Sequence, residues 1–104
     1  MPRYLYLSYF FGGAFLANAL AHFISGICGR PFPTPFASPP GKGLSSPILN
    51  VIWGTFNLLV GYFLIGQVGD FHLRTIPDAL AAILGAFCMA LMLARAFGRL
   101  QNIK

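Results

Sequence analysis

The sequence predicts an all-α membrane protein with three transmembrane helices and a proline-rich loop between helices 1 and 2. Three long apolar stretches fill most of the 104-residue chain. A helix needs about 20 apolar residues to cross roughly 30 Å of hydrocarbon, because each residue advances it by about 1.5 Å. Hydrophobic residues make up 57% of the chain and charged residues only 9%, too few to cover a soluble domain of this size. We therefore expect a single transmembrane domain over residues 1–104.

The first span is expected over about residues 4–28. Three tyrosines lie at its start, as aromatic residues do at the headgroup level: Tyr4, Tyr6 and Tyr9. Gly29 and Pro31 interrupt the helix at its end. Ala17-Asn18-Ala19 also has the small-x-small pattern of a signal-peptide cleavage site. Because the apolar run continues past it to Cys28, we expect a retained span.

The proline-rich loop is expected over residues 30–46. Pro31, Pro33 and Pro35 fix every second φ angle, which forces an extended backbone. Phe32 and Phe36 on this segment need apolar cover, and prolines lower the entropy lost on ordering. We therefore expect an ordered loop that packs against the spans.

The second and third spans are expected over about residues 47–68 and 76–97. Ser46 is a good N-cap for the second, and Pro47 occupies a first helical position where a missing N–H costs nothing. Thr75 and Asp78 have capping-box spacing at the start of the third. The second span also carries Gly54 and Gly61, which permit close helix packing.

Small residues form a stripe along one face of the third span. The stripe, called the alanine stripe below, consists of Ala82, Ala86, Ala90 and Ala94 at i+4 spacing. Small residues let the backbone of another helix approach closely. The stripe therefore predicts a helix-packing surface, and we expect the protein to self-associate through it.

A second row of residues is polar. This polar seam consists of Asn18, His22 and Ser25 on the first span and Asn50 and Asn57 on the second. Polar side chains in hydrocarbon turn toward other helices or water and often mark function. The seam either lines a path for a small polar solute or ion, or supplies hydrogen bonds between helices. For His22, the one intramembrane group that titrates near neutral pH, we expect Asn18 or Asn57 as partner.

The cytoplasmic rim of the second span is a candidate anion site. Arg30 and Lys42 flank Ser45, Ser46 and a helix N-terminus, whose N–H groups and dipole favour anions such as lipid phosphates. The alternative is ordinary headgroup contact by basic residues near the membrane.

The distribution of basic residues predicts the topology. One side carries Arg3 and Arg74, and the other carries a larger set: Arg30, Lys42, Arg95, Arg99 and Lys104. The positive-inside rule then places the loop and the C-terminus in the cytoplasm and the N-terminus outside, in what we expect to be a bacterial inner membrane.

Several function classes are not indicated. The chain shows no Ser-His-Asp catalytic motif and no HxxxH or CxxC spacing, so we expect no enzyme activity, cofactor or metal. The net charge of +5 comes from scattered basic residues and few acids, which argues against nucleic-acid binding. The leading hypothesis is an oligomeric channel or transporter subunit in the lipid bilayer, which also contacts anionic headgroups. The alternatives are a non-catalytic accessory subunit of a larger membrane complex and a lipid-binding scaffold.

Overall fold

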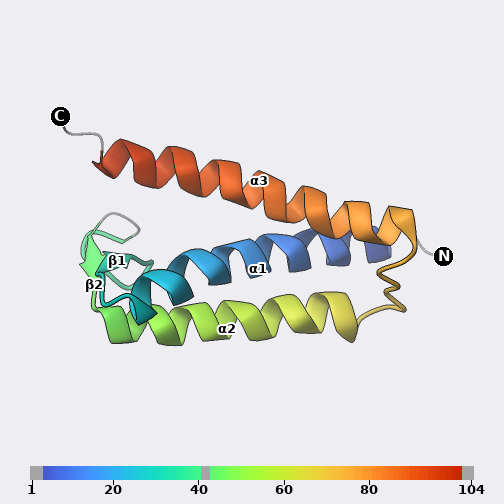
Figure 1. Ribbon diagram of the computed structural model, residues 1–104, viewed down its shortest axis with the longest axis horizontal. Helices are drawn as coiled ribbons and strands as arrows, with labels where there is room; N and C mark the ends of the chain where they lie inside the picture. The colour runs from blue at the N-terminus through green and yellow to red at the C-terminus, as the bar shows by residue number, and fades with distance from the viewer. Residues whose placement is uncertain (1–3, 41–42, 102–104) are drawn as a thin grey trace.

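Three helices build the described part of the protein. The computed structural model describes residues 4–40 and 43–101, with side chains described as far as Gly98. The helices are α1 (Tyr4–Ile27), α2 (Pro47–Gly66) and α3 (Ile76–Gln101). All three are long and apolar enough to cross a membrane, which is consistent with the predicted class of an all-α membrane protein. They lie side by side in a bundle with extents of 47 × 26 × 21 Å (Figure 1).

The helix ends follow local sequence signals. The Ser46 hydroxyl accepts a hydrogen bond from Leu49 N at 3.1 Å and so caps α2. Gly29 has a φ of +73° after the end of α1, and Arg30 N donates to Ser25 O across it. The third helix continues to Gln101, beyond the expected boundary at residue 97. The expected boundary followed the end of the apolar pattern. The helix continues beyond it because residues 98–101 contain no proline that would end a helix.

The first helix is the centre of the bundle. It packs against α2 in antiparallel orientation and against α3 in parallel orientation, with α1 drawn between the other two in Figure 1. Gly54 of α2 lies so close to α1 that a Cβ atom there would stand 2.6 Å from Phe23 N. Gly26 of α1 meets Pro47 of α2 in the same way, since its Cβ would lie 2.6 Å from the Pro47 carbonyl oxygen.

The contact between α1 and α3 is reciprocal. A Cβ atom on Gly13 would overlap the Ala82 carbonyl, and one on Gly85 would overlap the Phe10 carbonyl. The two glycines therefore lie level with each other, and each accepts the backbone of the opposite helix where no side chain fits. This close approach fixes the register of the parallel pair.

The segment between α1 and α2 folds back over one end of the bundle. It contains two short antiparallel strands, β1 (Phe32–Pro33) and β2 (Leu44–Ser45), with Phe32 opposite Ser45. Within this segment, Pro33 and Thr34 are buried. The strand pair places backbone carbonyls of this segment directly above the polar seam.

Candidate functional site

The polar seam holds α1 and α2 together near mid-span through two asparagines. Asn18 Nδ2 donates to Asn57 Oδ1 at 2.9 Å, and Asn57 Nδ2 donates to the Trp53 carbonyl at 2.7 Å. The Asn57 side chain is 1% exposed. Both amides thus find partners inside the subunit, where an unmade bond would be costly.

Asn50 connects the seam to the strand pair. Its amide nitrogen donates to three carbonyls, those of Phe32, Ser45 and Ser46, at 3.1 to 3.2 Å. Its Oδ1 lies 2.8 Å from His22 Nδ1. Because the amide oxygen has no hydrogen to give, His22 must donate, which places the ring proton on Nδ1.

The expected partner of His22 was wrong. Asn18 and Asn57 form a hydrogen bond with each other instead, and the His22 imidazole is hydrogen-bonded to Asn50. The physical reason is the antiparallel packing: a residue one turn farther along α1 meets a residue nearer the start of α2. The His22 side chain is 2% exposed and therefore faces protein, as predicted.

Aromatic rings enclose the imidazole. Phe32, Trp53 and Phe97 approach it edge to face, with ring centroids 5.4, 6.4 and 6.2 Å away. These residues come from β1, α2 and α3, so His22 is the one seam residue at which all three helices and the strand pair meet. Within the described part of the chain, Nε2 makes no hydrogen bond.

The remaining seam residue does not join the network. Ser25 is half-buried, and no hydrogen bond from its hydroxyl is found among the described residues. Ser8, which the seam pattern did not include, instead donates to the Leu64 carbonyl at 2.6 Å. Ser8 could have been found from the sequence, because it is a polar residue within an apolar run.

The rim residues divide into separate roles. Ser45 Oγ is buried against Thr34 Oγ1, whereas Ser46 is exposed and its Oγ caps α2. Arg30 is exposed, and Lys42 lies outside the described residues. Binding of anionic lipid headgroups by Arg30 and Lys42 stays a prediction.

The predicted packing residues lie at different surfaces. Gly54 and Gly61 are buried against α1, with Phe23 and Leu16 as neighbours. In the alanine stripe, Ala82 and Ala86 are half-buried, whereas Ala90 and Ala94 are exposed. Gly13, which the sequence reasoning did not single out, lies where a Cβ would overlap the backbone of Ala82 in the stripe. A glycine in a helix interior costs about 1 kcal/mol relative to alanine, and this was the missed signal.

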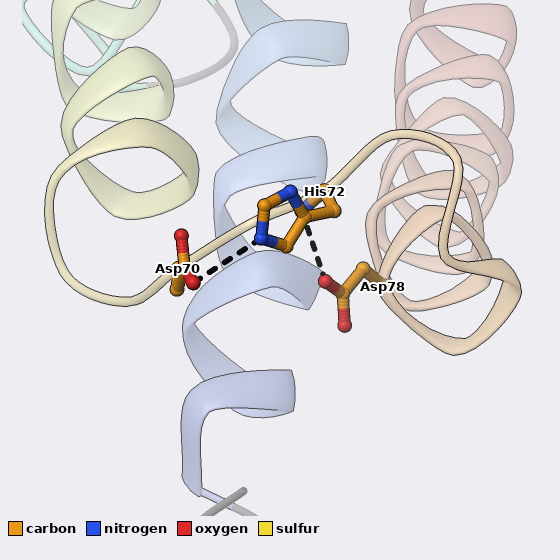
Figure 2. Close-up of polar contacts among 3 residues, drawn as sticks. All are labelled: Asp70, His72 and Asp78. Atoms are coloured by element: carbon orange, nitrogen blue, oxygen red, sulfur yellow. Dashed lines mark hydrogen bonds and ion pairs between the residues drawn. The ribbon is translucent and has the colours of Figure 1, made fainter.

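A second polar group gathers at the opposite end of the bundle. Asp78 is 1% exposed, and its Oδ2 accepts a hydrogen bond from His72 N at 3.0 Å. The His72 ring pairs with Asp70 at 3.2 Å on the exposed side (Figure 2). Asp78 thus reaches back to His72 and not to Thr75, the residue with which it has capping-box spacing.

Two grooves on the surface of the described residues are apolar. One of about 340 Å³ lies between α1 and α2 and is lined by Leu16, Ala19, Leu20, Phe23, Gly54 and Leu58. No group of three His, Cys, Asp or Glu side chains suited to a metal ion occurs within residues 4–40 and 43–98. The amide groups of the three seam asparagines are turned inward and paired, and the described grooves offer no polar lining.

Comparison with known proteins finds no match among protein-family models, curated proteins or solved structures. Function must therefore be inferred from the geometry itself.

Proposed function

We propose that the protein is a non-catalytic subunit of a membrane assembly, and that it self-associates through α3. The observation that supports this is the exposed half of the alanine stripe. Ala82 and Ala86 lie at the contact with α1, but Ala90 and Ala94 are exposed where α3 diverges from the other helices (Figure 1). A second copy of the chain can pack a helix closely against these small residues.

The pairing within the seam supports the same proposal. Asn18, Asn50 and Asn57 all use their amides inside the subunit. Hydrogen bonds of this kind stabilise membrane helices by about 0.6 to 2 kcal/mol each. The seam then serves to hold a rigid three-helix unit together, and the exposed half of the alanine stripe serves to assemble it.

The test changes the size of the exposed stripe. Leucine at both positions, Ala90→Leu with Ala94→Leu, should reduce the mass of the protein in nanodiscs to that of a single chain. Ala96→Leu is the matched control, because Ala96 is also exposed but lies on the opposite face of α3. A parent protein that is already a single chain would contradict self-association. An unchanged mass in the double variant would remove the stripe from the interface.

A channel or transporter function is the second candidate, and the enclosed His22 favours it. An imidazole that donates from Nδ1, and whose Nε2 makes no hydrogen bond among the described residues, offers Nε2 as a site for a proton inside the spans. Proteoliposomes containing a pH-sensitive dye should then show proton flux that His22→Leu abolishes and that His72→Leu, a change in an exposed loop residue, preserves. Equal flux with and without protein would exclude proton conduction.

A further inference from the structure

Two buried oxygen atoms at one end of the bundle have no hydrogen-bond partner among the described residues. They are Tyr9 Oη on α1 and Asp78 Oδ1 on α3. The Tyr9 side chain is 0% exposed and that of Asp78 is 1% exposed. Buried polar groups in proteins are nearly always hydrogen-bonded, so an unpartnered pair calls for an explanation.

The register of the helices brings the two residues to one place. Tyr9 precedes Gly13 by one turn on the same face of α1, and Asp78 precedes Gly85 by two turns on the same face of α3. Since Gly13 and Gly85 lie level in the parallel pair, Tyr9 and Asp78 both lie in the contact between α1 and α3 and about one turn apart.

The connection between α2 and α3, residues 67–75, covers both side chains. A Cβ atom on Gly69 would stand 2.6 Å from Tyr9 Oη, and the Phe71 ring packs edge to face on Tyr9 at 5.0 Å. His72 N donates a hydrogen bond to the other carboxylate oxygen of Asp78, Oδ2, as Figure 2 shows. The connection therefore encloses both oxygens and keeps them from solvent.

The charge of the Asp78 carboxylate has no opposite partner in the described part of the chain. The His72 ring pairs with Asp70, and the exposed Arg74 makes no ion pair among the described residues. The N-terminus of α3 offsets part of the charge. Removing a carboxylate from water still costs several kcal/mol when no cation accompanies it.

We propose that Asp78 Oδ1 and Tyr9 Oη bind a small monovalent cation of the sodium class. Carboxylate and phenol oxygens are hard donors, which suit hard cations rather than soft metals. The absence of a three-residue His, Cys, Asp or Glu group within the described ranges disfavours a transition metal. The close approach of Gly69 leaves no room for an organic ammonium group. A bound cation would neutralise the carboxylate and give both oxygens a partner.

The test measures thermal unfolding of the full-length protein in detergent. Sodium chloride should raise the Tm relative to choline chloride at equal ionic strength, and the rise should grow with the logarithm of sodium concentration. Asp78→Asn should abolish the sodium effect, and Tyr9→Phe should reduce it. Asp70→Asn, a change in an exposed carboxylate, should retain it.

Other results would overturn the proposal. A parent Tm that is the same in sodium and choline, or a sodium effect that survives in Asp78→Asn, excludes the site. A Tm that responds to acid and not to sodium identifies a proton as the ligand of the two oxygens. A Tm that responds to neither indicates that a water molecule bridges them. If Asp78→Asn does not fold, broadening of the sodium NMR signal by the parent and its loss in Tyr9→Phe decide the question.

Discussion

Asn50 shows how one side chain can join several parts of a small membrane protein. It contacts His22 of α1, Phe32 of β1 and Ser45 of β2, and its own backbone lies in α2. The side chain is fully buried, so no water replaces these bonds. A protein with few polar groups concentrates its hydrogen bonding at such a position, because each unmade bond in hydrocarbon is costly.

At this scale we predict that Asn50→Leu destabilises the fold by about 2 kcal/mol. Leucine is close in size to asparagine, but it leaves the His22 Nδ1 proton and buried carbonyls without a partner. The free energy of unfolding in mixed micelles with increasing SDS measures the loss.

Thr55→Val is the matched control for Asn50→Leu. The Thr55 hydroxyl is exposed and bonds only to Val51 O one turn back on its own helix. We expect its effect to stay within about 0.5 kcal/mol. Equal effects of the two substitutions would show that the Asn50 network does not stabilise the fold.

At the scale of elements, close packing of α1 on α3 depends on two glycines. Gly13 and Gly85 each lie where a Cβ would overlap the opposite backbone. Backbone atoms cannot move aside as a flexible side chain can, so any side chain at these positions pushes the helices apart.

We predict that Gly13→Ala destabilises the protein by about 2 kcal/mol and displaces α3 from α1. Gly98→Ala is the control, since a Cβ there meets no atom within 4 Å. It should be neutral or stabilising by up to about 1 kcal/mol, because alanine is the better helix former. Thermal unfolding measures both, and hydrogen exchange in α3 should rise only for Gly13→Ala. A stable Gly13→Ala protein with slow exchange would contradict the close contact.

The sequence predicted the elements better than their pairing. Apolar length, Ser46 and Pro47 are local signals, and α2 begins at Pro47 as those signals indicate. The partner of His22 depends on how far α1 is shifted along α2, which no local pattern records. The partner of Gly13 likewise appears only once α3 is known to lie parallel to α1. The buried pair Tyr9 and Asp78 was unpredictable for the same reason.

At the scale of the whole molecule, the two ends of the bundle differ in charge. The end with the strand pair carries Arg30 and Arg95, and the other end carries Arg74 among the described residues. The start of α1 and the end of α3 lie at opposite ends of the bundle, as an odd number of spans requires (Figure 1). By the positive-inside rule, we propose that the strand-pair end faces the cytoplasm.

We predict that Cys28, exposed beside Arg30, reacts with a membrane-impermeant thiol reagent only from the cytoplasmic side. The measurement uses Cys88→Ser protein in inside-out vesicles and in intact spheroplasts. The control is Leu73→Cys in a background without other cysteines, because Leu73 is 76% exposed at the opposite end. It should show the reverse pattern. Labelling of Cys28 from outside would invert the proposed topology.

The central place of α1 also determines the order in which the protein is completed during synthesis. Of the three helices, α1 leaves the ribosome first, yet its contacts are finished last, because one face waits for α2 and another for α3. The His22–Asn50 pair can form once α2 is in the membrane. The face with Gly13 must meanwhile contact lipid or the insertion machinery. A chain interrupted within residues 67–75 should therefore hold a formed helical hairpin with an open groove, which a separately synthesised α3 can enter.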